Sequence, residues 1–323
     1  MLRLFALYST SLLTTSLLVS ASSVYTLSNE VIGSAFLSDF VWETIADPTH
    51  GRANYISQAD ALAQNLSYVS EDGNAFILRT DDTTTLRASG VGRNSTRIRS
   101  VATYTTHVAV FDIRHMPQGC GTWPAVWETN RYDWPNSGEV DIFEGANDVR
   151  PNLSSLHTSA NCTMPAQRNM TGTATSLQCS VLDNGNQGCG VLSKKANNYG
   201  PAFNAAGGGW YALERTNTYI RVFFWGRNDA TVPSDVKKGK CCVDTSAWGT
   251  PVAVFPSTSC DLDSHFGENN IIINLTFCGD WAGAPSLFTK AGCPGTCVDY
   301  VNNNPSAFSN AYWDLGAVRV YEQ

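Results

Sequence analysis

The sequence predicts an all-β fold in which two sheets pack as a sandwich or jelly roll. Stretches rich in β-branched and aromatic residues recur along the chain, and clusters of Gly, Asn and Asp separate them. Charged residues make up only 15% of the 323 residues, so long amphipathic helices, which need a charged face, are not expected. Many strands with few helices are typical of β-sandwiches and jelly rolls.

The first element along the chain is a predicted leader. Arg3 is followed by an apolar run that ends in the small residues at 20–23, the pattern of a secretory signal peptide. We place the signal peptide at 1–21, with 23 as the latest cleavage point, and a single domain at 22–323. A membrane anchor is the alternative, but the run is short and Ser and Thr interrupt it. A soluble, secreted protein is therefore expected.

Strands are predicted where β-branched and aromatic residues concentrate. In chain order the clearest segments are 103–113, 219–225, 269–277 and 317–321. Turn residues lie between such segments, at 72–74, 183–186 and 207–209. Neither a fixed-period repeat nor a Pro/Ser/Thr-rich linker divides the chain, which favours one domain.

The ten cysteines indicate disulfides, because their number is even and the chain is expected to be exported. Nine of them lie in the second half, among Gly- and Asn-rich stretches, so the bridges are expected to join loops. Their pairing is left open, except that the adjacent Cys241 and Cys242 are expected to bond to separate partners. A zinc site is not favoured, because Cys-x-x-Cys spacing is absent.

The net charge and the sequons indicate which classes of partner to expect and whether the surface is glycosylated. The formal net charge of −7 argues against nucleic acid and anionic membranes as partners, and is compatible with a neutral polymer. Nothing in the sequence indicates an oligomer, and a monomer is expected. Asn-x-Ser/Thr sequons predict a glycosylated surface, and they begin at Asn65, Asn94, Asn152, Asn161, Asn169 and Asn274.

The segment 137–145 carries three carboxylates within six residues. In a strand, residues two apart share a face, so Glu139 and Asp141 point the same way. Strict alternation would turn Glu144 to the other face. One extra residue, accommodated as a β-bulge, would return Glu144 to the carboxylate face.

Three neighbouring acids suit glycoside hydrolysis. Their proximity raises one pKa and leaves another group ionised, and a retaining glycosidase needs one carboxylate nucleophile and one carboxylic acid. The two carboxyl groups must lie about 5–5.5 Å apart, which requires a curved, concave strand and thereby a cleft. Calcium binding is the alternative, but calcium loops favour flexible Asp/Asn/Gly turns, whereas these acids alternate with Val, Ile and Phe.

Aromatic residues gather just upstream of the carboxylates. Trp123, Trp127, Tyr132 and Trp134 lie there, and Trp281 lies on a second predicted loop. Indole rings stack on the apolar faces of sugars, so these residues are candidates for the walls of a glucan cleft. Core packing is the alternative for each of them.

The segment Gly138–Glu144 resembles the active-site signature of glycoside hydrolase family 16, in the form with one extra residue before the last Glu that its laminarinase-like members carry. The resemblance extends over the mature chain. Segments 33–37, 47–52, 115–124 and 274–281 resemble those of fungal secreted endo-β-1,3(4)-glucanases.

This resemblance implies a β-jelly-roll sandwich of two antiparallel sheets whose concave face binds glucan. It implies Glu139 as nucleophile, Asp141 as its assistant and Glu144 as acid/base. It also implies a set of residues that bind the substrate or lie close to the catalytic acid: Trp127, Trp134, His157, Trp281 and Arg97.

The predicted function is a secreted, retaining endo-β-1,3(4)-glucanase that hydrolyses internal β-1,3 linkages, and adjacent β-1,4 linkages, in glucans such as laminarin. The partner is then a β-glucan polysaccharide. No cofactor is expected, and the resemblance allows a structural calcium ion that the sequence does not locate. One alternative is a cell-wall transglycosylase that uses the same carboxylates. The other is a non-catalytic β-glucan-binding protein.

Overall fold

The computed structural model describes residues 23–149 and 151–323. The predicted signal peptide at 1–21 lies outside these ranges. Within them, no helix combines the length and the apolar character that a membrane crossing requires.

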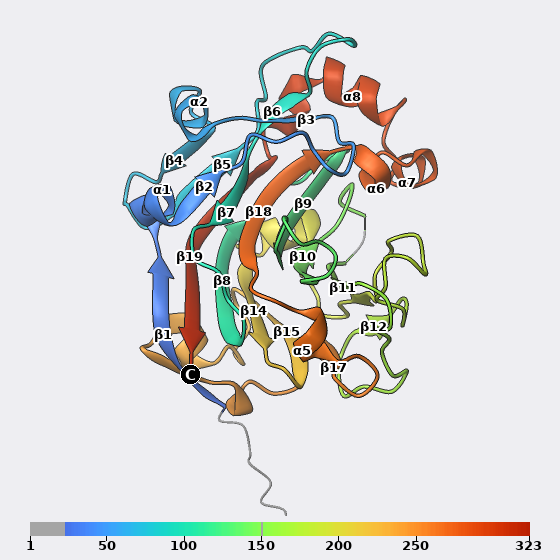
Figure 1. The fold of residues 1–323 in the computed structure, drawn as a ribbon. Coiled ribbons are helices and arrows are strands. Elements are labelled where there is room, and N and C mark those ends of the chain that lie inside the picture. The colour runs from blue at the N-terminus through green and yellow to red at the C-terminus, as the bar shows by residue number, and fades with distance from the viewer. Residues whose placement is uncertain (1–22, 150) are drawn as a thin grey trace, which may run out of the picture.

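Two large antiparallel sheets pack face to face, as the jelly-roll prediction requires (Figure 1). One sheet has nine strands, in the order β16-β1-β19-β8-β14-β15-β17, with β5 pairing to β19 and β4 pairing to β5. Its strands are β1 (Val24–Val31), β4 (Ser67–Val69), β5 (Phe76–Arg79), β8 (His107–His115), β14 (Gly209–Arg215), β15 (Tyr219–Gly226), β16 (Cys242–Asp244), β17 (Ala253–Pro256) and β19 (Tyr312–Glu322).

The other large sheet has eight strands, in the order β12-β13-β11-β10-β9-β18-β7-β2. Its strands are β2 (Phe40–Trp42), β7 (Arg97–Ser100), β9 (Thr122–Thr129), β10 (Glu139–Glu144), β11 (Leu153–His157), β12 (Thr173–Ala174), β13 (Val191–Leu192) and β18 (Asn270–Phe277). A parallel pair, β3 (Ala53–Tyr55) and β6 (Arg93–Ser95), lies outside both sheets.

The helices are short and connect strands. The α-helices are α1 (Phe36–Asp39), α2 (Gln58–Ala63), α3 (Gly200–Ala205), α4 (Ser234–Lys238), α5 (Leu262–His265), α6 (Gly279–Ala282), α7 (Pro285–Lys290) and α8 (Cys297–Asn303). The 3-10 turns are η1 (Gly33–Ala35), η2 (Thr245–Ala247) and η3 (Pro305–Phe308). Figure 1 shows α6, α7 and α8 grouped at one end of the sandwich, beyond the ends of β18 and β9.

The predicted strands are present, with two boundaries shifted. The segment predicted at 103–113 becomes a strand only at His107, because Tyr104 instead forms a bridge to Asn269, next to β18 of the other sheet. The segment predicted at 317–321 begins earlier, at Tyr312, because residues 312–315 pair with β5. Each difference comes from a partner strand that is distant in sequence.

The main core lies between the two sheets. From β10, the fully buried Val140, Ile142 and Phe143 point into it. Phe143 meets Tyr211 of β14 edge-on, with ring centroids 4.9 Å apart. The carboxylates that alternate with these apolar residues therefore emerge on the opposite face of the eight-stranded sheet.

A second apolar layer covers the outer face of the nine-stranded sheet. Trp225 of β15 stacks on Phe223, and Trp248, just after η2, packs edge-on against both rings. Val236 of α4 and Val243 of β16 belong to the same buried cluster. This cover explains why 219–225 is apolar on both sides: β15 is buried on both faces.

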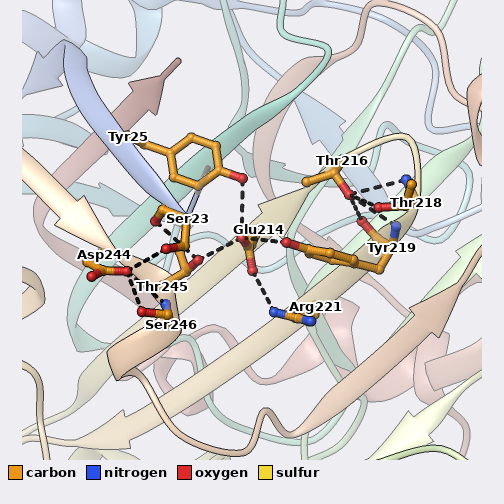
Figure 2. Close-up of polar contacts among 10 residues, drawn as sticks. All are labelled: Ser23, Tyr25, Glu214, Thr216, Thr218, Tyr219, Arg221, Asp244, Thr245 and Ser246. Carbon is orange, nitrogen blue, oxygen red and sulfur yellow. Dashed lines mark hydrogen bonds and ion pairs between the residues drawn. The ribbon is translucent and has the colours of Figure 1, made fainter. Parts of the chain in front are cut away.

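A buried carboxylate ties this cover to the sheet (Figure 2). Glu214 of β14 is fully buried and accepts hydrogen bonds from Tyr25 (3.2 Å), Tyr219 (3.0 Å) and Thr245 (2.7 Å). Arg221 lies 3.4 Å from its second oxygen. The Glu214 cluster thus joins β1, β14, β15 and η2 through one side chain.

Four disulfides form, and they join loops and strand ends as predicted. The pairs are Cys120–Cys293, Cys162–Cys260, Cys179–Cys189 and Cys278–Cys297. The prediction that Cys241 and Cys242 bond to separate partners is wrong. Both are free thiols, because the other eight cysteines bond among themselves.

Two of the six sequons cannot serve as glycosylation sites in this fold. The side chains of Asn152 and Asn274 are buried and hydrogen-bonded inside the molecule. The prediction of surface glycans is wrong at these positions, because an attached sugar needs an accessible amide nitrogen. Glycosylation at the remaining four sequons stays a prediction.

Candidate active site

The β10 strand brings all three carboxylates to one face by means of a bulge. In the pairing of β10 with β9, Asp141 lies opposite Trp127 while Phe143 lies opposite Val126, so Ile142 is an extra residue. Beyond Ile142, the alternation of side chains between the two faces of the strand is shifted by one position. Glu144 therefore joins Glu139 and Asp141 along the same cleft. The predicted bulge is confirmed.

Asp141 is the buried centre of the carboxylate group. It is 3% exposed, and its Oδ2 accepts a hydrogen bond from Ser155 Oγ at 3.0 Å. His157 Nε2 lies 3.3 Å from the same oxygen, and Asn186 Oδ1 lies 2.8 Å from His157 Nδ1. Both Ser155 and His157 come from β11, whose pairing sets His157 opposite Glu139. His157 is thereby held between two acids.

Glu144 is fixed through its backbone and its carboxylate. Trp123 Nε1 donates a hydrogen bond to Glu144 Oε1 at 2.8 Å. The backbone N–H of Glu144 donates to Asn152 Oδ1, also at 2.8 Å. Asn152 Nδ2 in turn donates to the carbonyl of Ile142, the bulge residue, at 3.1 Å. On the β11 side, where strand pairing ends at Asp141, the buried Asn152 amide thus holds the backbone of the bulge.

Burial and mutual repulsion perturb the ionisation of both glutamates. Burial raises the pKa of Glu139 to about 7, and the nearby Asp141 charge adds to the rise. Burial, again reinforced by Asp141, raises the pKa of Glu144 well above its ordinary value. His157 and Arg97 lower the pKa of Glu139, whereas the largest lowering of the Glu144 pKa comes from the neutral indole of Trp123. Both carboxyl groups therefore hold a proton more readily than a free glutamate does.

His157 responds in the opposite sense. Burial alone lowers the pKa of the imidazole, but the hydrogen bond to Asp141 and the charges of Glu139 and Asp141 outweigh it and raise the pKa to about 10. The ring is therefore cationic at neutral pH. Its positive charge favours ionised carboxylates at Glu139 and Asp141.

The carboxylates lie in a cleft of ≈ 780 Å³ on the outer face of the eight-stranded sheet. Trp127 forms part of its floor, with its Nε1 bonded to Asn274 Oδ1 at 2.8 Å and the Arg97 guanidinium 4.8 Å from its ring centre. Trp281 of α6 stands edge-on to Trp123, with centroids 5.4 Å apart. The cleft thus has acids at its centre and aromatic rings around them.

The eight residues that the family resemblance implies all line this cleft: Arg97, Trp127, Trp134, Glu139, Asp141, Glu144, His157 and Trp281. Of the two further aromatic candidates, Trp123 lines the cleft, whereas Tyr132 does not and is exposed. Trp134 is 40% exposed, on the loop between β9 and β10. Their roles in catalysis and binding stay predictions, but the structure does bring them together.

Sequence reasoning missed the residues that hold the site in place. Glu43 of the loop after β2 accepts from Arg97 Nε at 2.8 Å and also contacts Arg131 at 3.0 Å. Asn152, Ser155 and Asn186 are missed in the same way. For Asn152 a signal was present but misleading, since its sequon suggested a surface position.

One group in the described residues has the composition of a metal site. Ligand atoms of Glu139, Asp141 and His157 all lie within 4.8 Å of one another. A metal ion would have to displace the proton of His157, because it needs the neutral imidazole and the neighbouring carboxylates raise the pKa of that ring. The structural calcium ion allowed above is not located by any of these contacts.

Comparison with known proteins identifies the family. The family model described as "XgeA-like, catalytic GH16 domain" matches residues 40–321. The chain belongs to glycoside hydrolase family 16. The family-16 signature predicted from Gly138–Glu144 is thus confirmed.

Solved family-16 structures are closely similar. Laminarinase 16A from Phanerochaete chrysosporium, solved with 6-O-glucosyl-laminaritriose in donor and acceptor sites, is 65% identical, with a TM-score of 0.91 over 92% of this chain and 99% of that one. An elongating family-16 β-1,3-glucosyltransferase is 36% identical, with a TM-score of 0.84 over 92% of this chain and 99% of that one. The jelly-roll prediction is confirmed.

Curated relatives are longer than this chain. A probable glycosidase of Schizosaccharomyces pombe is 40% identical over 93% of this chain and 70% of its own length. A probable endo-1,3(4)-β-glucanase of Aspergillus fumigatus is 40% identical over 98% of this chain, which spans only 49% of that relative.

Proposed function

We propose that this family-16 protein is a secreted, retaining endo-β-1,3(4)-glucanase that acts on laminarin-type glucans. The observation that carries the proposal is the bulged β10 strand, which sets a buried acid of raised pKa (Glu144) and a second carboxylate beside a cation (Glu139) along one cleft. These are the two groups that retaining hydrolysis needs. The similarity to laminarinase 16A supports a β-1,3-glucan as the partner.

In the proposed reaction, Glu139 attacks the anomeric carbon while Glu144 gives its proton to the leaving oxygen. Glu144, now ionised, takes a proton from water, which then attacks the covalent intermediate and releases the sugar with retained configuration. The His157 cation favours the ionised form of Glu139 before it attacks, and Asp141 holds that cation in place. Trp123 keeps Glu144 aimed at the cleft. No step calls for a cofactor.

Secretion is part of the proposal. Four disulfides support it, since such bonds persist in oxidising surroundings. To test secretion, the chain is expressed with residues 1–21 in a secreting host, and the protein recovered from the culture medium is sequenced from its N-terminus. A mature start between residues 22 and 24 is expected, and retention of the protein in the cell would contradict it.

Time-resolved proton NMR on laminarin tests the reaction. We expect β-anomeric reducing ends to appear first and then to mutarotate. Initial α-anomers would contradict the retaining mechanism. If neither laminarin nor lichenan is cleaved, the binding-protein alternative gains support.

The second candidate is transglycosylation, which the similarity to the β-1,3-glucosyltransferase favours. Its covalent intermediate would be captured by a sugar hydroxyl in place of water. The same NMR series separates the two functions, because transglycosylation lengthens products while the number of reducing ends stays constant.

A further inference from the structure

Cys241 and Cys242 form a pair of thiols at the edge of the nine-stranded sheet. Cys242 begins β16, which pairs with β1, and Cys241 precedes it. Their sulfur atoms lie 3.4 Å apart. Every other cysteine of the chain is in a disulfide, so neither thiol has a further cysteine to bond to within the molecule.

The backbone explains why two adjacent side chains meet. In an extended strand, successive side chains point to opposite faces, which would separate the sulfurs. Here α4 ends at Gly239 in the left-handed conformation (φ 57°), and the chain turns before entering β16. The carbonyl of Cys241 accepts from Leu27 N at 2.8 Å, and Cys242 pairs with Thr26. The neighbouring strand β1 therefore holds the main chain at both residues while the sulfurs remain side by side.

The surroundings favour a bond between the two sulfurs over a bound metal ion. Cys242 lines a surface hollow of ≈ 370 Å³ whose other polar walls include Lys240, Asp235 and Asp244. Zinc prefers four ligands of the His and Cys type, and no His lines this hollow. Across the described ranges, the group of metal-type side chains that lies close enough together is the one in the cleft.

We propose that Cys241 and Cys242 are a reversible modification site that closes into a vicinal disulfide. The co-reactant is a small disulfide such as oxidised glutathione. The thiolate of the exposed Cys241 attacks it, forms a mixed disulfide and releases one thiol. Cys242 then loses its proton and displaces the second thiol. Two electrons and two protons pass from the protein to the reagent, and one S–S bond replaces another.

This bond should open more readily than the other four. Cys241 is exposed and Cys242 half-buried. Of the eight disulfide cysteines, seven are buried, and the half-buried Cys120 is bonded to the buried Cys293. Thiol exchange requires access to the sulfur. The site lies on the sheet opposite the cleft-forming one, so its state should leave glucan cleavage unchanged.

Peptide mass spectrometry tests the proposal on the full-length protein. After equilibration with oxidised glutathione and alkylation in denaturant, the peptide containing both residues should be about 2 Da lighter than its dithiol form, with neither cysteine alkylated. Mild treatment of the native protein with reduced glutathione should then release two thiols before any of the other eight. Two alkylated cysteines after oxidation, a stable glutathione adduct on the wild type, or a disulfide-linked dimer would each overturn the proposal.

Single variants supply the matched control. Cys242→Ser leaves the attacking thiol without its resolving partner, so this variant should retain glutathione as a stable adduct that the wild type expels. Cys241→Ser removes the attacking thiol and should take up little glutathione under the same conditions. Absence of the adduct from Cys242→Ser, or equally fast uptake by Cys241→Ser, would also overturn the proposal. Cleavage rates of both variants should equal those of the wild type.

Discussion

The Glu214 cluster and the cleft acids both contain buried carboxylates, and they are built in opposite ways. Glu214, on the outer side of the nine-stranded sheet, is surrounded by donors from Tyr25, Tyr219, Thr245 and Arg221 (Figure 2). The cleft acids are set beside one another. Burial and like charge raise the pKa of Glu139 to about 7. Burial alone therefore does not mark an active site. A buried carboxyl group can exchange a proton near neutral pH when too few donors and cations surround it to keep its pKa low.

The largest expected effect separates the two clusters by activity. Glu139→Gln should lower kcat by about 10⁴-fold or more, because an amide cannot act as the nucleophile. Glucan binding should persist, as measured by calorimetry. Glu214→Gln is the matched control, with the same chemical change in the other cluster and an unchanged kcat. If Glu139→Gln turned over substrate near the wild-type rate, the cleft would not be the active site.

Asn152 tests whether the bulge itself matters. Asn152→Ala removes the bonds to Glu144 N and to the carbonyl of Ile142. We expect kcat to fall by about 10²-fold with little change in KM, because Glu144 is displaced without loss of cleft walls. Ser154→Ala is the control, since Ser154 bonds to the same Ile142 carbonyl and to Asn152 Nδ2 but forms no hydrogen bond with Glu144. An equal loss of kcat in both variants would point to general loosening of β10.

The stabilities of the two clusters should respond with opposite signs. Glu214→Gln should lower the free energy of unfolding by about 1–3 kcal/mol, because buried donors lose their charged acceptor. Folded Glu139 binds its proton more tightly than the unfolded chain does, so its contribution to stability falls as pH rises from 4.5 to about 7. Glu139→Gln should therefore gain stability relative to the wild type across that window. Urea unfolding at both ends of the window measures the two effects.

Replacement of His157 tests how its positive charge affects the pKa of the cleft glutamates. Its cation lowers the pKa of both cleft glutamates, so His157→Gln should move both limbs of the kcat/KM profile to higher pH, by about one unit. Asn186→Ala, which removes only the support of His157 Nδ1, should give a smaller shift in the same direction. A shift to lower pH would contradict the charge assigned to His157.

The smallest effect concerns the cleft wall. Trp281→Ala should raise KM for laminarin about 3–10-fold and leave kcat nearly unchanged, because a stacked ring is lost away from the reacting carbon. Trp281→Phe keeps an aromatic surface and should recover most of the affinity. If both variants keep the wild-type KM, Trp281 is a packing partner of Trp123 and does not contact sugar.

Local patterns in the sequence were enough to predict several strands and the carboxylate motif of β10. Alternation of Val140 and Phe143 with the acids, together with one surplus residue, implied both the strand and its bulge, because the side-chain period of a strand is fixed by backbone geometry. The tryptophans were candidates because indoles stack on sugars, and the family resemblance added His157 and Arg97. These residues do meet in one cleft.

Local patterns in the sequence could not predict contacts between segments that are far apart in the chain. The sequence by itself determined the strand character of β10 and of four further segments, and which acids share a face. Only the tertiary structure decided that Asn152 turns inward to hold the bulge, that Glu43 supports Arg97, and that Cys241 and Cys242 face each other. The physical reason is that side-chain periodicity is a local property of the backbone, whereas burial and partner choice depend on how distant strands pack.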